Sequence, residues 1–329
     1  MGKDREENRI LYLSSGDIAS LDPEVSGIIR AVEEVFREKG EGRTEMPPKP
    51  GLHPRREAFI HAMPAYVPSL KMMGIKWISA YPGNPAKGLP QIAGLMILND
   101  PATGLPLAVL DSSRITALRT AAASAVAARH LARPASSRIG ILGAGVQGFA
   151  HLEAMKALFP LTTAVVYDIL PEKTDIFAEK AAARWPALEI IRADNPEEAV
   201  TGADIIITAG PITRRPHATI QRSWFREGSF ASLVDFDAYW SGEALKAADK
   251  FITDDIPQLE FYQKKGYFQD IPPVYAELAE LVTGRKKGRE NDHERTIACH
   301  LGIAIGDIAA ATMIYHEAIS KGIGRWLPR

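Results

Sequence analysis

A glycine-rich segment is the part of this sequence whose residue types and spacing point most directly to chemistry. Residues 138–142 form an apolar run typical of a buried strand, and Gly143-Ala144-Gly145-Val146-Gln147-Gly148 follows it directly. In a strand–turn–helix unit the first glycine permits a tight turn and the second lets a pyrophosphate approach bare backbone. The third lets helix and strand pack closely, and the amino-terminal N–H groups of the helix face the phosphates. This pattern predicts a dinucleotide site.

An acidic residue, Asp168, ends the next apolar run, about 20 residues after the last glycine. A carboxylate at this place can hold the adenine ribose diol and repels the additional phosphate of NADP. Ile169 and Leu170 follow it and offer no arginine that could accept that phosphate. We therefore expect NAD as the cofactor. The residues expected to contact it are Gly143, Ala144, Gly145, Val146, Gln147, Gly148, Asp168, Thr120 and Thr208.

Two basic residues stand where an anion could be bound. Lys76 lies in a predicted strand between Ile75 and Trp77, and alternation places it on the opposite face from both. A desolvated lysine could pair with a substrate carboxylate or shuttle a proton, and an exposed lysine on a strand surface is an equal alternative. Arg119 lies near the start of a predicted alanine-rich helix, 116–132, where it could grip a carboxylate together with the helix amino terminus. A solvated arginine on a first helical turn is the commoner case.

Two aspartates follow a predicted parallel strand, 229–234, at the sheet edge where ligands bind. The Asp237 carboxylate can exchange protons with a reacting nitrogen or with water. Capping of a following helix suits Asp235 better.

The elements that must position these residues predict an α/β fold. From residue 138 onward, strand and helix alternate, which predicts a Rossmann-type doubly wound parallel sheet. Before it, short strands with glycine and proline between them predict a mixed, largely antiparallel sheet. A last helix is expected from about 296 to 320, and we expect its far half to return to the first domain. The predicted domains are 1–132 for the first part of a substrate domain, 133–303 for the NAD-binding domain, and 304–329 for the returning helix.

Composition narrows the class of partner. The 329 residues are 46% hydrophobic and 24% charged, as in an ordinary globular protein. The formal net charge of −1 produces no positive electrostatic potential that would attract nucleic acid or an anionic membrane. The single cysteine and the absence of zinc-ligand spacings imply no metal. A charged start, residues 1–7, without a following apolar run predicts a cytoplasmic protein, and small molecules are the expected partners.

Taken together, these segments resemble the ornithine cyclodeaminase/mu-crystallin family over nearly the whole chain. The resemblance rests on many short motifs in one order, which is more specific than the glycine motif alone. They are Met63-Pro64-Ala65, Gly74-Ile75-Lys76, Asn84, Gly88-Leu89-Pro90, Leu118-Arg119-Thr120-Ala121-Ala122-Ala123-Ser124, the 143–148 turn, Gly202-Ala203-Asp204-Ile205-Ile206, Asp237, Glu243, Gly284-Arg285, Gly288-Arg289 and Gly302-Ile303-Ala304-Ile305-Gly306-Asp307.

The resemblance implies a homodimer in which the domain built from both chain ends binds substrate and dimerises, with catalysis beside the nucleotide. It implies that Lys49, Lys76 and Arg119 bind the α-carboxylate of an amino or imino acid. Asp237 would handle protons at the α-nitrogen or activate water, and Lys76 is also counted as catalytic. Members include cyclodeaminases, an alanine dehydrogenase and imine reductases, so dehydrogenation, imine reduction and cyclodeamination all stay open. A non-catalytic dinucleotide-binding protein of the crystallin type and an interaction subunit of another enzyme remain alternatives.

The chain departs from the family near two of these residues. Ornithine cyclodeaminases carry a glutamate just before the Met-Pro pair, and the corresponding residue near this place is His61, so His61 is included among the substrate-binding residues and ornithine selectivity is not implied. Tyr239 and Trp240 replace a Pro-Gly-Lys segment after Asp237. Two aromatic rings at this place predict a bulkier or more apolar substrate.

Overall fold

The structure is a computed structural model that describes residues 8–55 and 57–329. The charged start at 1–7 lies outside the described residues. The chain forms two compact units by its internal contacts, one with Met1–Arg119 and Ile303–Arg329 and the other with Thr120–Gly302. Segments from the first and the last part of the chain therefore contribute to the first unit. The division falls between Arg119 and Thr120 inside one helix, whereas the expected boundary was 132/133.

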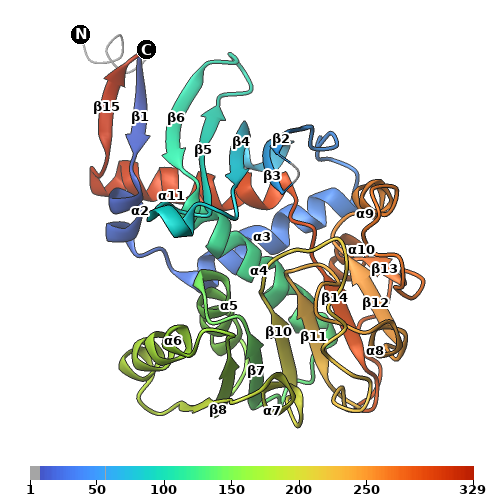
Figure 1. Cartoon of the computed structure of the whole chain (residues 1–329). Helices are drawn as coiled ribbons and strands as arrows, with labels where there is room; N and C mark the ends of the chain where they lie inside the picture. Colours follow the sequence, from blue (N-terminus) through green and yellow to red (C-terminus); the bar gives the residue numbers. More distant parts are fainter. Residues whose placement is uncertain (1–7, 56) are drawn as a thin grey trace. The chain divides into compact units, whose positions relative to one another are not determined.

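The first unit is an α+β layer. Its elements are β1 (Arg9–Leu13), α2 (Ser15–Leu21), α3 (Val25–Gly40), β2 (Gly51–Arg55), β3 (Ala58–Val67), β4 (Met72–Ala80), β5 (Ile92–Asn99), β6 (Pro106–Asp111), α11 (Ala304–Lys321) and β15 (Arg325–Pro328). The strands form a seven-stranded sheet in the order β15-β1-β6-β5-β4-β3-β2 (Figure 1). Only β1 and β6 run parallel among the paired strands that the structure describes, so the expected mixed, largely antiparallel sheet is confirmed.

One face of this sheet is covered by helix. The α11 helix contacts α3 and the strands β3, β4 and β5. In α3, Ile28, Ile29, Val32 and Phe36 recur at helical spacing and are fully buried. Because side chains alternate along β4, every second residue of that strand points to the helical layer and the residues between point to the opposite face.

The second unit is a doubly wound sheet. Its elements are β7 (Arg138–Leu142), α5 (Val146–Lys156), β8 (Thr163–Tyr167), α6 (Pro171–Arg184), β9 (Glu189–Arg192), α7 (Pro196–Val200), β10 (Ile205–Thr208), β11 (Phe230–Leu233), α8 (Gly242–Lys246), β12 (Lys250–Thr253), α9 (Ile256–Gln263), β13 (Ala276–Glu277), α10 (Leu278–Val282) and β14 (Thr296–Cys299). Its eight strands are all parallel, in the order β13-β12-β14-β11-β10-β7-β8-β9, which confirms the predicted fold class.

The order of these strands defines a topological switch point. The chain runs outward from β7 to β8 and β9, and then returns to the other side of β7 with β10 and β11. In such sheets ligands bind beyond the carboxyl ends of the strands where the order reverses. The residues that follow β7 and β10 therefore lie at the place where a dinucleotide is expected.

The expected helix from 296 to 320 is wrong at its start. Residues Thr296–Cys299 form β14, which lies between β11 and β12 and is fully buried, and α11 begins only at Ala304. Gly302 separates the two with a φ of 76°, a left-handed conformation that favours glycine. A buried strand is apolar on both faces. Its residues therefore cannot be distinguished by periodicity from the apolar start of the next helix.

Candidate functional site

A buried group of two cations and one acid lies within the first unit. The Lys76 ammonium donates to Asp307 Oδ1 at 2.6 Å, and Arg119 Nε donates to the same oxygen at 2.8 Å. Lys76 Nζ is also 3.4 Å from the hydroxyl of Thr116. Lys76 comes from β4, Asp307 from the first turn of α11, and Arg119 from the helix α4 (Ser113–Leu131). The structure therefore brings together two residues that the sequence predicted and one that it did not.

The charges in this group do not cancel. Two positive side chains share one carboxylate, which leaves a net charge of +1 in a place where Lys76 is 1% exposed. Burial lowers the pKa of Lys76 to about 7, and the repulsion of Arg119 and of Lys49 acts in the same direction. The Asp307 carboxylate opposes this fall. An uncompensated positive charge in a desolvated place favours the binding of an anion.

The other two predicted substrate residues lie on neighbouring segments. Lys49 precedes β2 and is close enough to Lys76 to lower its pKa. His61 lies in β3, where its ring stacks on Phe59 at a centroid distance of 4.0 Å and meets His53 edge-on at 6.0 Å. In the same strand Met63 is the partner of Lys76 in β4.

One part of the sequence argument for Arg119 needs correction. The helix begins at Ser113 rather than at 116, so Arg119 lies in its second turn and not at its amino terminus. The electrostatics of a helix terminus fall off within the first turn and cannot explain this arginine. Its partner is Asp307 instead. The signal that could have found Asp307 is an acid inside the otherwise apolar run 303–311, where an ion is buried only if it is paired.

In the second unit, the glycine turn has the geometry that a dinucleotide needs. Gly143 has a φ of 103°, and a methyl group there would lie 2.6 Å from the carbonyl oxygen of Ala209. A Cβ at Gly148 would lie 2.1 Å from the Gly143 carbonyl oxygen, which fits close packing of α5 on the turn. At Gly145, the residue before α5, an added Cβ meets no atom within 4 Å. The backbone at Gly145 can thus be approached by a ligand, and the residues present fit the cofactor.

Asp168 lies directly beside this turn. Its Oδ2 accepts from the backbone N–H of Ala144 at 2.9 Å, and its Oδ1 accepts from Leu170 at 3.0 Å. A carboxylate has about four lone-pair sites, so both oxygens can still accept from ribose hydroxyls. Of the expected cofactor residues in this segment, Val146 is exposed and Ala144 is buried.

The two threonines of the expected cofactor set differ in their surroundings. Thr120 is a buried residue of α4. Thr208 ends β10, and its hydroxyl donates to Asp235 Oδ1 at 2.7 Å. Asp235 Oδ2 accepts from the backbone N–H of Gly210 at 2.9 Å. The expectation that Asp235 caps a helix is therefore wrong, because its carboxylate ties the end of β11 to the end of β10.

Burial changes the acidity of both aspartates after β11. It raises the pKa of Asp235 to about 7, and the charge of Asp237 adds to this effect. The pKa of Asp237 is also raised by burial, and its Oδ1 accepts no hydrogen bond from the described residues. A raised carboxyl pKa is what a group needs to exchange protons near neutral pH.

The backbone around Asp237 is strained. Phe236 and Phe268 have φ angles of 62° and 53°, which bulky residues rarely adopt. Their rings pack together at 4.8 Å, and the Phe268 backbone partly opposes the rise that burial causes in the pKa of Asp237. Such strain persists only where the surrounding packing enforces it, and it clusters at functional sites.

The position of Trp240 does not support the expectation of a bulkier or more apolar substrate. The indole of Trp240 is fully buried, meets Phe225 edge-on at 5.2 Å, and belongs to the core of the second unit. Tyr239 packs against Gly210, where an added Cβ would lie 2.4 Å from its ring. Neither ring is evidence for a bulky substrate.

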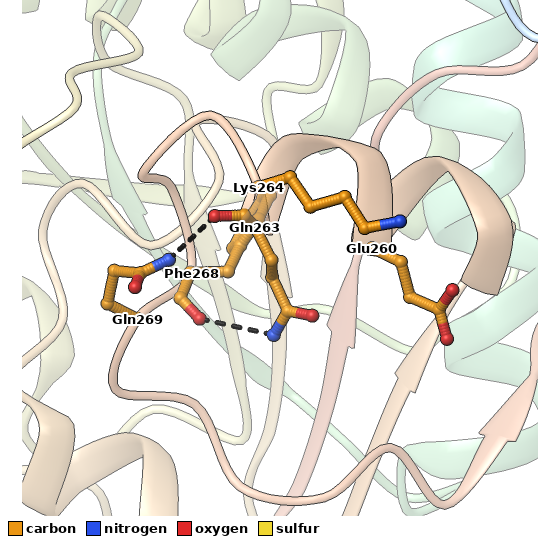
Figure 2. A pocket seen from close by; sticks show the side chains of 5 residues that line it. All are labelled: Glu260, Gln263, Lys264, Phe268 and Gln269. Carbon is orange, nitrogen blue, oxygen red and sulfur yellow. Dashed lines mark hydrogen bonds between the residues drawn. The ribbon is translucent and has the colours of Figure 1, made fainter.

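A surface hollow elsewhere shares only Phe268 with the residues described above. It has a volume of about 350 Å³ and lies beside α9, lined by the five residues that Figure 2 shows, Glu260, Gln263, Lys264, Phe268 and Gln269. Two hydrogen bonds lie inside it, from Gln269 Nε2 to the Gln263 carbonyl and from Gln263 Nε2 to the Phe268 carbonyl. Within residues 8–55 and 57–329, no three His, Cys, Asp or Glu side chains are placed to hold a metal. Over the same residues, none of the helices has the length and hydropathy that a membrane span requires.

Comparison with known proteins places the chain in a family. An alanine dehydrogenase of Archaeoglobus fulgidus is 35% identical over 95% of this chain and 97% of its own length. The structure of Thermococcus litoralis Δ1-pyrroline-2-carboxylate reductase, in complex with NADH and L-proline, matches with a TM-score of 0.88 and 34% identity over 96% of this chain and 99% of that one. An archaeal alanine dehydrogenase dimer with bound NAD matches with a TM-score of 0.86 and 34% identity over 97% and 99% of the two chains. The sequence profile of the ornithine cyclodeaminase/mu-crystallin family matches residues 17–322. This confirms the resemblance, and the chain belongs to the ornithine cyclodeaminase/mu-crystallin family.

Proposed function

We propose that this protein is an NAD-dependent enzyme that acts on the C–N bond of an α-amino or imino acid by hydride transfer at Cα. The observation that carries the proposal is the buried group of Lys76, Arg119 and Asp307 with its net positive charge. A substrate carboxylate would neutralise this charge. The two relatives whose structures were compared are named for alanine and for pyrroline-2-carboxylate, which both carry such a carboxylate.

The substrate-binding residues are Lys76, Arg119 and Lys49. Arg119 uses only Nε for Asp307 among the described residues, so its terminal nitrogens can donate two parallel hydrogen bonds to a carboxylate. Lys76 and Lys49 add positive charge from β4 and from the segment before β2. His61, two residues before Met63, the β3 partner of Lys76, contacts the remainder of the substrate in this proposal.

The cofactor residues are those of the 143–148 turn with Asp168, Thr120 and Thr208. NAD, when bound, accepts or supplies the hydride. The N–H groups at the start of α5 bind the pyrophosphate, and Gly145 lets it come close. Asp168, which no arginine follows, favours NAD over NADP. The Thr208 hydroxyl, which donates a hydrogen bond to Asp235, contacts the cofactor at the carboxyl end of β10 in this proposal.

Asp237 moves the proton. In the direction of oxidation it accepts a proton from the substrate nitrogen or from an attacking water, and in the direction of reduction it donates one. Its position directly after Phe236, whose backbone is strained, fixes where the carboxylate lies. Dehydrogenation, imine reduction and cyclodeamination all use these residues, so the choice among them depends on the substrate.

We also propose that the protein acts as a homodimer. On the face of the first sheet opposite α11, Trp77 lies beside Leu95 and Ile75 lies beside Ile97. Trp77 is 45% exposed and Leu95 is 46% exposed. Exposed apolar patches of this kind mark interaction surfaces, and one matched alanine dehydrogenase is a dimer. The expected cytoplasmic location stays a prediction.

One experiment tests the function and separates the reactions. The protein is incubated with NAD or NADH and with ornithine, lysine, alanine and cyclic imino acids, and the products are identified by mass spectrometry. Oxidation to a keto acid with NADH formation identifies a dehydrogenase, consumption of NADH with an imine identifies a reductase, and ring closure without net NADH change identifies a cyclodeaminase. NADH binding without any product from this panel would contradict the proposal and favour a non-catalytic dinucleotide-binding protein.

A further inference from the structure

The acid that joins the two predicted cations has no role in the activity described so far. Asp307 is 0% exposed, and its Oδ1 accepts from both Lys76 and Arg119, while its Oδ2 is buried and accepts no hydrogen bond from the described residues. A buried carboxylate in an apolar helix is costly unless it is paired. The Asp307 carboxylate is paired with two cations, which come from two other elements, β4 and α4.

We propose that Asp307 is the positioning residue of the carboxylate-binding group, which holds the Lys76 ammonium and the Arg119 guanidinium side by side and keeps Lys76 protonated. This inference rests on the proposed function, because it gives Lys76 and Arg119 the task of binding a substrate carboxylate. Asp307 itself does not contact the reacting atoms in this proposal. Its effect reaches the substrate only through the two cations.

The geometry explains why two like charges can remain together. Without a counter-ion, a buried ammonium and guanidinium repel each other, and lysine is the group that can lose its proton. Because both donate to the same oxygen, the Asp307 carboxylate attracts both positive charges and offsets the repulsion between them. Asp307 also occupies Arg119 Nε, which leaves the two terminal nitrogens of the guanidinium for a second carboxylate.

The charged and polar groups that face Lys76 come from three elements. Asp307 belongs to α11, Arg119 and Thr116 belong to α4, and Lys49 precedes β2. Asp307 is the single acid among them, while Arg119 and Lys49 both disfavour the protonated form of Lys76. Removal of the Asp307 charge therefore leaves two charged groups, Arg119 and Lys49, that both favour loss of the proton from Lys76, together with the neutral Thr116 hydroxyl. A neutral Lys76 would no longer attract a carboxylate.

The test measures the protonation of Lys76 directly. Lysine labelled with ¹³C at Cε is incorporated into the full-length protein, the Lys76 signal is assigned by its loss in Lys76→Met, and its chemical shift is followed by NMR against pH. In Asp307→Asn we expect the titration midpoint to fall by about 1 pH unit or more, a tenfold loss of proton affinity. Asp307→Glu, which keeps the charge, should restore most of it. A control, Glu317→Gln, removes an acid from the same helix that pairs with a surface lysine, Lys321, at 2.6 Å, and should leave the Lys76 midpoint unchanged.

A second measurement compares the steady-state kinetics of the wild type and the Asp307→Asn variant. With the substrate found active, Asp307→Asn should raise KM by tenfold or more at pH 8 and less at pH 6, with a smaller effect on kcat. An unchanged or raised Lys76 midpoint in Asp307→Asn overturns the inference even if the enzyme is active. The NMR titration needs no turnover, so failure of the proposed function and failure of this inference are separate results.

If Asp307→Asn does not fold, the double variant Lys76→Met/Asp307→Asn still tests the inference. If Asp307→Asn alone unfolds but Lys76→Met/Asp307→Asn folds, the two charges depend on each other and the inference is supported. If the double variant also fails to fold while Lys76→Met folds, Asp307 is required by the helix packing rather than by the cations, and the inference is overturned.

Discussion

The Lys76 ammonium lies 2.6 Å from Asp307 Oδ1, although 231 residues separate the two in the sequence. Neither end of the chain could form this pair alone, because β4 belongs to the first part of the chain and α11 to the last. The assembly of one unit from both chain ends therefore also assembles the group of Lys76, Arg119 and Asp307 for which we propose carboxylate binding. Arg119, bound to the same oxygen, completes it.

The first prediction concerns the pH dependence of carboxylate binding. Burial and Arg119 lower the pKa of Lys76 to about 7, so Lys76 is protonated below this pH and loses its charge as the pH rises through it. Inhibition by propionate, a carboxylate without an amine, should be constant at low pH and weaken up to tenfold per pH unit above about 7. Lys76→Met should bind propionate weakly at every pH. An inhibition constant that stays flat from pH 6 to pH 9 in the wild type contradicts the role of Lys76.

The second prediction concerns stability at Asp235. Burial raises the pKa of this carboxyl from 3.8 to about 7, so the folded protein binds more protons than the unfolded chain between these values. Its contribution to stability is present below about pH 4 and is lost as the pH rises through 7. Relative to Asp235→Asn, the wild type should lose up to about 1.4 kcal/mol per pH unit within this window.

Urea denaturation of both proteins from pH 4.5 to pH 8 measures this difference. The carboxamide cannot accept from both Thr208 and Gly210 as the carboxylate does, which adds an offset that does not depend on pH. The test is therefore how the difference in unfolding free energy between the two proteins changes with pH, and not the size of that difference at one pH. A difference in unfolding free energy that is the same at all pH values shows that Asp235 does not titrate in this range.

The third prediction separates cofactor contact from packing in the glycine turn. Gly145→Ala meets no protein atom within 4 Å and should leave the melting temperature unchanged, but it should weaken NADH binding by tenfold or more. Gly148→Ala places a methyl group 2.1 Å from the Gly143 carbonyl oxygen and should lower both stability and NADH affinity. Gly83→Ala, which also meets nothing within 4 Å, is the control and should change neither. Isothermal titration with NADH and thermal unfolding give the two quantities, and normal NADH affinity in Gly145→Ala argues against a pyrophosphate at this residue.

The fourth prediction concerns Asp237. Asp237→Asn keeps the shape of the side chain and removes its ability to exchange a proton, so turnover should fall by about 10²- to 10⁴-fold while NADH affinity stays within about twofold. Asp175→Asn, which changes an acid of a surface ion pair with Arg192, is a matched control in the same unit. Steady-state kinetics and NADH titration are compared for the three proteins. Full activity in Asp237→Asn would refute the assigned proton transfer.

Much of the fold follows from patterns that are local in the sequence. The parallel sheet was predictable because each of its first strands is a short apolar run followed by a helix, and the glycines 143, 145 and 148 show the turn that joins the first pair. The strand β14 was missed because Thr296–Cys299 is apolar on both faces and runs into an apolar helix. Periodicity cannot separate a buried strand from a buried helix segment over four residues.

Individual residues of the candidate site could be predicted from the sequence, but the hydrogen bonds and ion pairs between them could not. Lys76 and Arg119 could be singled out by type and position, and an acid in the apolar run 303–311 indicates that Asp307 is paired, but no local pattern shows that these two cations are its partners. Asp235 was assigned to a helix cap because capping is a local interaction, whereas its actual partners lie on the neighbouring strand end, 25 and 27 residues away. Trp240 shows the same limit, since a ring next to a proposed active-site residue in sequence can still point into the core.

The last prediction concerns assembly through the open face of the first sheet. Alternation along β4 turns Lys76 toward the helical layer and Trp77 away from it, so the same strand carries the proposed substrate contact on one face and the proposed dimer contact on the other. Trp77→Glu places a charge among Leu95 and its neighbours, and burying that charge in an interface is unfavourable. Light scattering with size-exclusion chromatography should show a dimer for the wild type and a monomer for Trp77→Glu. Ile176→Glu, at a 62% exposed apolar residue of α6, is the control and should remain a dimer. A monomeric wild type, or a Trp77→Glu protein that stays dimeric, excludes this face as the interface.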